Sequence, residues 1–285
     1  MTAVVIAVPL FGAYGCASEN ATPKPGVTAT ISLPGPTGDE GASAGARPPA
    51  DNAGPARRNQ RASPWSGMTV VIDPGHNGGN AEAAEEISRQ VPSGPGEKSC
   101  DTVGAESADG YAEHRFTWEF SLLLRERLEE RGIEVVMTRD DNEGVGPCIN
   151  ERAAIGNRAA ADAAISIHAD GAPADVRGFH IIAPGHLDGY TDDIVEPSRQ
   201  LATDLRDRFH EHANQPYADY IGEEGIDVRT DLGGLNLSDV PKVFLEAGNL
   251  GNPEDAAKLT EPKWQSQAAG AVAKGLIDYL HRQRD

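Results

Sequence analysis

The sequence predicts a single α/β domain in which a mostly parallel, twisted sheet is flanked by helices. Short apolar segments with the composition of buried strands alternate with stretches in which apolar residues recur at helical spacing. Strands that alternate with helices favour a mostly parallel sheet, because a connecting helix returns the chain to the same edge. The sequence contains no internal repeat. The predicted strands are 68–73, 133–138, 163–168, 179–183 and 242–248.

The long predicted helices fill intervals between these strands. In the first, apolar residues recur at helical spacing over 116–128, Glu and Arg occupy the other face, and Gly132 ends the helix. The stretches 150–161 and 196–212 have helical character as well. A last helix is expected over 264–282, where apolar residues stand four apart.

The amino-terminal segment resembles an export signal. Residues 3–15 are uncharged and end at Cys16, and this run is shorter than the about 20 apolar residues that cross a bilayer. It has the length of the apolar region of a secretory signal, and small residues before a cysteine resemble a bacterial lipoprotein signal. We therefore expect residues 1–16 to direct export, with Cys16 lipidated as a membrane tether. A buried amino-terminal strand is the alternative.

A linker is predicted between this segment and the folded domain. Residues 17–65 contain eight prolines and six glycines, with no aromatic residue before Trp65. Such a segment has too little apolar surface to offset the entropy of ordering, so we expect it to be disordered. The folded domain is predicted over residues 66–285, and we expect it to be monomeric.

The charge of the chain excludes one class of function. The whole chain has 25 Lys and Arg against 44 Asp and Glu, a formal net charge of −19. Residues 67–285 alone carry 20 cations and 40 acids, so the acidity belongs to the predicted domain. Binding of nucleic acid or of an anionic lipid surface needs clustered Lys and Arg, and we expect neither here.

Chemically active side chains stand where strands end. His76 follows the first strand, His168 ends the third, Glu246 lies near the end of the last, and Glu113 opens the first long helix. Working groups of such sheets gather beyond the carboxyl ends of the strands. Two histidines and one glutamate commonly hold a catalytic zinc, and the second glutamate would be the general base. Taken singly, such a histidine is more often structural and a glutamate at a helix start is usually a cap.

Four segments of this chain resemble the zinc-dependent N-acetylmuramoyl-L-alanine amidase family of the amidase-3 type. The likeness runs over residues 68–281 and extends to the compact, secreted mycobacterial-type enzymes, which share the GPC stretch at 146–148. The order His, Glu, His and catalytic Glu is that of the family. The segments are VVIDPGHNGG (70–79), EHRFTWEFSLLLRERLEERGIEVVMTR (113–139), ERAAIGNRAAADAAISIHAD (151–170) and VFLEAGNLGNPEDAAKL (243–259).

The resemblance implies a site and a reaction. His76, Glu113 and His168 would hold one Zn²⁺ per chain, and Glu246 would be the catalytic base. The enzyme would use zinc-activated water to cleave the amide bond between N-acetylmuramic acid and L-alanine, in peptidoglycan or in muropeptide fragments. Its location would be the cell envelope or the extracellular space, on the outer face of the cytoplasmic membrane if Cys16 is lipidated.

The resemblance also points to residues around the zinc and along the substrate groove. Asp73 is expected either to orient His76 or to form the turn at the strand end. The stretch 231–237 is expected to line the substrate groove. Arg139 and Arg152 are expected to brace the fold. The family usually has Asn four residues after its ligand glutamate, where this chain has Thr117. The set is Asp73, Asn77, Arg139, Arg152, Leu235 and Asn236.

The two remaining cysteines fit an exported domain. Cys100 lies in a polar, Gly-rich insertion at 79–112, and Cys148 lies in the loop 140–149. Neither has the setting of a zinc ligand or of a nucleophile. In an oxidising compartment we expect them to form a disulfide, which would close a loop of about 48 residues and contribute roughly 4 kcal/mol.

Two other functions remain open at this stage. A zinc peptidase acting on stem peptides would use the same metal chemistry. A catalytically silent module that binds the cell wall would keep the fold, but such modules typically lose ligands, and this sequence retains all four site residues.

Overall fold

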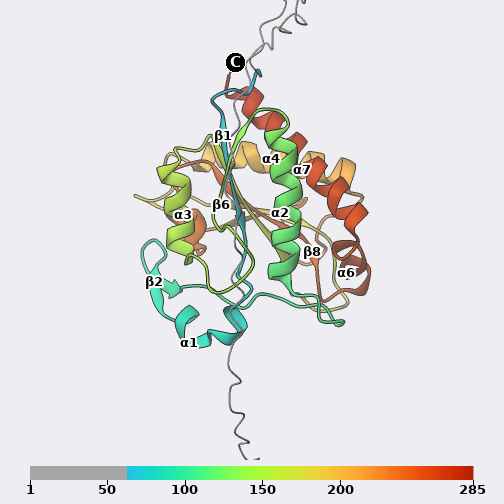
Figure 1. The fold of residues 1–285 in the computed structure, drawn as a ribbon. Helices are drawn as coiled ribbons and strands as arrows, with labels where there is room; N and C mark the ends of the chain where they lie inside the picture. The colour runs from blue at the N-terminus through green and yellow to red at the C-terminus, as the bar shows by residue number, and fades with distance from the viewer. Residues whose placement is uncertain (1–62, 285) are drawn as a thin grey trace, which may run out of the picture. The chain divides into compact units, whose positions relative to one another are not determined.

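The centre of the molecule is one mixed sheet, in a computed structural model that describes residues 63–284 (Figure 1). The strand order is β4-β1-β5-β8-β6-β7; neighbouring strands pair in parallel, except that β6 pairs antiparallel with β8. The predicted fold class is therefore confirmed. The strands are β1 (Thr69–Pro74), β4 (Glu134–Met137), β5 (Ala163–Asp170), β6 (His180–Pro184), β7 (Ile226–Arg229) and β8 (Lys242–Asn249).

Helices cover both faces of this sheet (Figure 1). The three longest, α2, α4 and α7, lie on one face, where α7 packs against both α2 and α4, and α3 lies on the other. All four were predicted, with boundaries that differ by one to three residues. The helices are α1 (Ala84–Ile87), α2 (Glu113–Glu129), α3 (Ile149–Arg158), α4 (Val195–Ala213), α5 (Gly233–Asn236), α6 (Pro253–Leu259) and α7 (Pro262–Arg282).

The two faces of the sheet differ in chemistry. Successive side chains of a strand point to opposite faces, so Val70 and Ile72 enter the large core beneath α2, α4 and α7. Val71 points the other way, into a small apolar cluster. The α3 face also carries buried polar side chains, among them Asp73 of β1 and Lys242 of β8. This second face leads to the candidate site.

The insertion forms a small substructure that its polar sequence did not predict. It contains the 3₁₀ turn η1 (Asn80–Glu82), α1, and a hairpin of β2 (Gln90–Pro92) and β3 (Glu97–Ser99). Cys100 and Cys148, the pair that the sequence analysis joined, form a disulfide with a sulfur–sulfur distance of 2.06 Å. The disulfide ties the end of this hairpin to the start of α3.

The start of the described chain already contacts the domain. The Ser63 hydroxyl donates a hydrogen bond to the carbonyl of Arg131, and Trp65 meets His281 edge to face. Residues 63–65, assigned to the linker by the sequence, thus lie against the domain. The expected export segment, Cys16 and the rest of the linker lie outside the described residues. Across 63–284, no helix has the length and apolar character that a membrane crossing requires.

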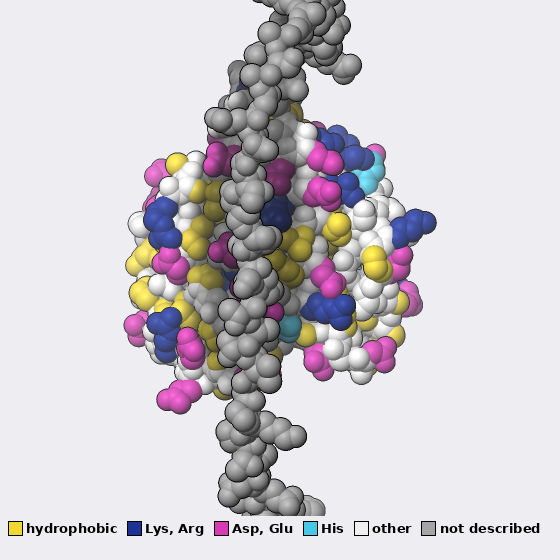
Figure 2. Space-filling view, viewed as in Figure 1, with side chains coloured by type: hydrophobic (Ala, Val, Ile, Leu, Met, Phe, Trp, Pro, Cys, Tyr) yellow, Lys and Arg dark blue, Asp and Glu magenta, His cyan; other side chains and the backbone are white. Residues whose placement is uncertain are grey.

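The surface charge agrees with the composition. On the uncovered parts of the face drawn in Figure 2, Lys and Arg side chains lie among Asp and Glu side chains rather than in one basic patch. Elsewhere in the described residues, surface cations form ion pairs with acids, such as Arg208 with Asp278 and Arg115 with Glu119. The drawn face offers no broad cationic surface of the kind that nucleic acid requires.

Candidate metal centre

Three predicted ligands meet at one edge of the sheet. His76 directly follows β1, His168 lies in the neighbouring strand β5, and Glu113 is the first residue of α2. His76 Nε2 is 3.2 Å from Glu113 Oε2, and His168 Nδ1 is 2.9 Å from Glu113 Oε1. Side-chain atoms of the three residues that can serve as ligands all lie within 4.8 Å of one another. The structure therefore brings together residues that are up to 92 positions apart in the chain.

The surroundings of these side chains fit a metal ion. The three are almost completely withdrawn from solvent, and two imidazoles with one carboxylate form a donor set typical of catalytic zinc. Two glycines make room for the rings. A Cβ on Gly75 would lie 2.2 Å from His168 Cε1, and one on Gly104 would lie 2.8 Å from His76 Cδ2.

The electrostatics of the cluster favour charged groups. Burial lowers the pKa of His76, but the Glu113 carboxylate and the hydrogen bond to Asp101 outweigh it and raise that pKa to about 10. Burial raises the pKa of Glu113, yet His76 and His168 overcome this effect and hold it well below its usual value. A cation is thus stabilised beside Glu113, which is what binding of a metal ion requires.

Glu246 is a second carboxylate beside these ligands, and its side chain is partly buried. It lies in β8, in register with His168 of β5, so both side chains leave the sheet on the same face. Its Oε2 is buried and has no hydrogen-bond partner within the described residues. Burial, together with the negative charges of Glu113 and Asp170, raises the pKa of Glu246 well above its usual value. A carboxylate with an unpaired oxygen at this place is suited to accept a proton from a water molecule or a substrate.

Two cavities flank the ligands. One, of about 450 Å³, is lined by Glu113 and Glu246 and also by Arg229. The other, of about 550 Å³, lies towards the β2–β3 hairpin and is lined by Lys98 and Ile149. Side chains shared by both cavities include His76, His168, Leu232 and Phe244. An extended substrate could therefore reach the ligands from both sides.

Asp73 was expected either to orient His76 or to form the turn, and its hydrogen bonds among the described residues do not include the His76 ring. Its carboxylate accepts hydrogen bonds from Arg152 and Lys242, at 2.8 and 3.2 Å, and from the hydroxyls of Thr138 and Ser166. The side chain points to the α3 face of the sheet and lines the cavity on the hairpin side, as His76 does. Through these hydrogen bonds its carboxylate links β1 to α3, β8 and β5.

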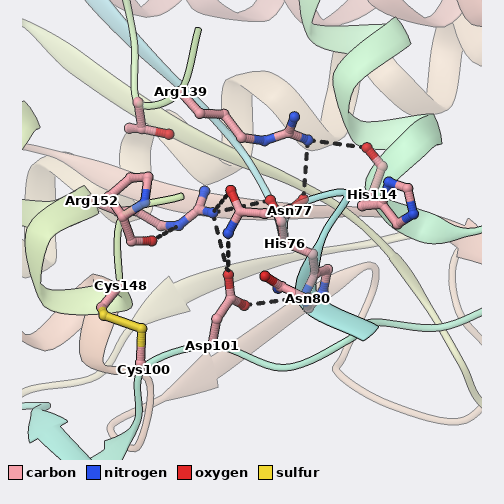
Figure 3. Close-up of polar contacts among 12 residues, drawn as sticks. His76, Asn77, Asn80, Cys100, Asp101, His114, Arg139, Cys148 and Arg152 are labelled. Atoms are coloured by element: carbon pink, nitrogen blue, oxygen red, sulfur yellow. Dashed lines mark hydrogen bonds and ion pairs between the residues drawn. A yellow bond between two sulfur atoms is a disulfide. The ribbon is translucent and has the colours of Figure 1, made fainter. Parts of the chain in front are cut away.

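The two predicted arginines brace the turn that carries His76. Arg152 of α3 donates to the carbonyls of Pro74 and His76, at 2.7 and 3.1 Å, and to Asn77 Oδ1. Arg139 also donates to the Pro74 carbonyl at 3.1 Å and to the His114 carbonyl at 3.1 Å, the second of which Figure 3 shows. Thr117, which replaces the usual Asn of the family, donates to the carbonyl of Gly75 at 2.7 Å. These contacts satisfy the backbone of a turn in which His76 adopts a φ of 58°.

The expectation for the stretch 231–237 holds only for its first half. Leu232, Gly233 and Gly234 line the cavity on the hairpin side, whereas Leu235 and Asn236 line neither cavity. Leu235 is completely buried, and the Asn236 amide donates to the carbonyls of Ser93 and Thr230 at 2.9 Å. The short helix α5 turns these two side chains inward.

Asp101 is a site residue that the sequence analysis missed. It lies 3.2 Å from His76 Nδ1, on the side of the ring away from Glu113. Its position directly after Cys100 was the only sequence signal, because the path of the insertion cannot be inferred from its composition.

A His-Glu-His cluster at the carboxyl edge of a mostly parallel sheet, with a free carboxylate beside it, defines a metal-dependent hydrolase. Residues 70–278 match the family model described as N-acetylmuramoyl-L-alanine amidase, and the chain belongs to this family. The resemblance drawn from the sequence is confirmed.

Relatives and solved structures agree with this assignment. The chain is 40% identical to the N-acetylmuramoyl-L-alanine amidase Rv3717 of Mycobacterium tuberculosis, over 76% of this chain and 88% of the relative. It superimposes on the amidase Ami1 of Mycobacterium smegmatis with a TM-score of 0.72 and 39% identity, covering 77% of this chain and 99% of that one. For Ami1 of Mycobacterium abscessus the TM-score is 0.71 and the identity 43%, with 75% and 99% covered.

Proposed function

We propose that this chain hydrolyses the amide bond between N-acetylmuramic acid and L-alanine, in peptidoglycan or in its muropeptide fragments. The observation that carries the proposal is the His76–Glu113–His168 cluster with the unpaired Glu246 carboxylate beside it. Membership of the amidase family supports the choice of bond.

His76, Glu113 and His168 hold one Zn²⁺ per chain. When bound, Zn²⁺ polarises the scissile carbonyl and lowers the pKa of water, so that hydroxide is available to attack the carbonyl near neutral pH. Glu113 accepts hydrogen bonds from the backbone N–H groups of Ala105 and Ala169, at 2.7 and 3.1 Å, which fixes both of its oxygens. Such fixed ligands favour one coordination geometry.

Glu246 carries the proton during the reaction. Its free Oε2 takes a proton from the attacking water and later gives it to the nitrogen of the leaving L-alanine. Because a general base must be unprotonated to begin, the positive charge of the bound metal has to lower the pKa that burial has raised. The carboxylate then returns to its starting state with each turnover.

The cavities on both sides of the ligands support an extended substrate. The glycan lies in one cavity and the stem peptide in the other, with the scissile amide above His76 and His168. The shared wall of Leu232 and Phe244 limits access of bulk water to the bond.

The enzyme acts as an exported monomer in the cell envelope, with Cys16 as a lipid tether to the outer face of the cytoplasmic membrane. The signal-like composition of residues 1–16 supports export. The Cys100–Cys148 disulfide supports it independently, since disulfides persist in oxidising compartments.

The test is an analysis of products by mass spectrometry after digestion of purified peptidoglycan and of defined muropeptides. We expect free stem peptides that begin with L-alanine, together with glycan that retains its lactyl group, and no release in the presence of a chelator that Zn²⁺ then reverses. Peptides cleaved within the stem would indicate a zinc peptidase, and absence of any product would indicate a silent wall-binding module.

A further inference from the structure

The aspartate that follows the disulfide faces the imidazole of a metal ligand. Asp101 Oδ1 is 3.2 Å from His76 Nδ1, and the carbonyl of Thr102 is 3.0 Å from the same nitrogen. With Nδ1 donating to these two oxygens, Nε2 is the nitrogen directed at Glu113, 3.2 Å away, and the one that would bind the metal ion. A histidine that binds metal through one nitrogen commonly donates its other N–H to a carboxylate or a carbonyl, which fixes its orientation.

Asp101 itself is held from several sides. The amide of Asn77 donates to its Oδ2 at 2.9 Å, Arg152 lies 3.4 Å from the same oxygen, and the backbone N–H of Thr102 donates to Oδ1 at 2.8 Å. The carboxylate is largely buried and points toward Asn77, Arg152 and His76 (Figure 3). Its orientation is therefore set before any metal binds.

The disulfide brings this aspartate to Arg152. Cys148 directly precedes α3, and the backbone N–H of Ile149 donates to the Cys100 carbonyl at 2.9 Å. Arg152 lies one helical turn further along α3, so the sulfur–sulfur bond and the Arg152–Asp101 pair connect the same two segments (Figure 3). The bond thus anchors the insertion next to the residue that its aspartate contacts.

Beyond Asp101 the same segment reaches the second ligand. The backbone N–H of Ala105 donates to Glu113 Oε2 at 2.7 Å, and Gly104 packs against both His76 and Glu113. Displacement of residues 101–105 would therefore disturb two ligands at once.

We infer that Asp101 is a positioning residue for His76, and that the Cys100–Cys148 disulfide holds Asp101 in place so that the metal binds tightly. The inference rests on the ligand set of the proposed function. According to this inference, the insertion 79–112 strengthens metal binding through the hydrogen bond between Asp101 and His76.

The first measurement is the affinity of the purified full chain for Zn²⁺, by competition with a chromophoric chelator. Asp101→Asn keeps a side chain of similar size but removes the charge, and we expect Zn²⁺ binding to weaken roughly 10- to 100-fold. Asp109→Asn changes an exposed aspartate in the same loop and is the matched control, with unchanged affinity expected. In the Co²⁺-loaded protein, the visible absorption bands should move in Asp101→Asn and stay fixed in Asp109→Asn.

The second measurement tests the disulfide. Replacing Cys100 and Cys148 together by Ala should also weaken Zn²⁺ binding. If the bond acts through Asp101, its removal from the Asp101→Asn protein has little further effect, so the two losses do not add. Should the double alanine variant fail to fold, reduction of the disulfide in the folded protein replaces it.

The outcomes separate this inference from the proposed function. Unchanged affinity and unchanged Co²⁺ bands in Asp101→Asn overturn the positioning role, and additive losses overturn the link to the disulfide. If the unaltered chain binds no Zn²⁺, or if His76→Ala binds it equally well, the proposed ligand set is wrong. If the chain binds one Zn²⁺ that His76→Ala loses, and Asp101→Asn leaves the affinity unchanged, the result contradicts this inference but not the proposed function.

Discussion

The pKa values of two neighbouring glutamates, the buried Glu113 and the partly buried Glu246, are shifted in opposite directions. Glu113 receives hydrogen bonds from the imidazoles of His76 and His168, which favour its charged form and lower its pKa. Glu246 has a free oxygen and negatively charged neighbours, so its pKa is raised. Pairs of carboxylates whose surroundings push their pKa values apart commonly divide roles in catalysis. Here the division is between metal ligand and proton carrier.

For the single residue Glu246, we predict that the substitution Glu246→Gln abolishes turnover without loss of the metal ion. The amide cannot accept the proton of the attacking water, and removal of a general base typically costs about 10²- to 10⁴-fold in rate. Zn²⁺ content by elemental analysis should stay near one per chain. Glu196→Gln, an exposed glutamate of α4, is the matched control. Full activity of Glu246→Gln would show that the assigned base is wrong.

A second prediction at the level of single residues concerns the contact of Gly104 with the metal ligands. Both Gly104 and Gly110 have positive φ, at 87° and 80°, but a Cβ would meet His76 and Glu113 only at Gly104. Gly110→Ala should therefore lower the free energy of unfolding by about 1–2 kcal/mol through backbone strain alone. Gly104→Ala should in addition weaken Zn²⁺ binding, which chelator competition measures. Equal Zn²⁺ affinities in the two variants would contradict this reading of the Gly104 contact.

Among the elements, β1, β5, β8 and α3 are joined by one buried charge cluster. Asp73 of β1 balances Lys242 of β8 and Arg152 of α3, and Ser166 of β5 completes the set. Asp73→Asn would leave the buried Lys242 without its counter-charge and Arg152 with only the more distant Asp101, so we expect a loss of about 3–5 kcal/mol in the free energy of unfolding. Denaturant titration measures it, with Asp239→Asn at an exposed site as control. A loss no larger than in the control would show that other groups neutralise the cations.

The elements that the sequence predicted are those with enough apolar residues to show a period. The five predicted strands and four long helices are present, and most of them, such as β5 and α7, bury apolar residues in the large core. The hairpin β2–β3 and the strand β7 were missed, since each strand has only three or four residues and is largely polar. Their positions depend on the disulfide and on pairing with β6 rather than on local pattern.

For the whole molecule the buried cluster predicts sensitivity to acid. Burial raises the pKa of Asp73, but Lys242, Arg152 and the hydroxyls of Ser166 and Thr138 bring it well below its ordinary value of 3.8. A lowered folded-state pKa stabilises the fold above the unfolded value, and this contribution is lost as pH falls through 3.8 towards the folded value. The free energy of unfolding should therefore fall more steeply below about pH 4 in the unaltered protein than in Asp73→Asn. Parallel pH curves would contradict the lowered pKa.

The sequence by itself determined the class of fold and the four residues proposed to carry the reaction. Buried strands need apolar runs, and the carboxyl ends of β1, β5 and β8 meet at one edge, so residues placed there must converge. Only the tertiary structure decided which side chains touch. Asp73, close to His76 in sequence, turns to the α3 face, while Asp101, 25 residues away, reaches the imidazole. The path of the insertion makes that contact, and the path depends on a disulfide and an arginine from distant parts of the chain.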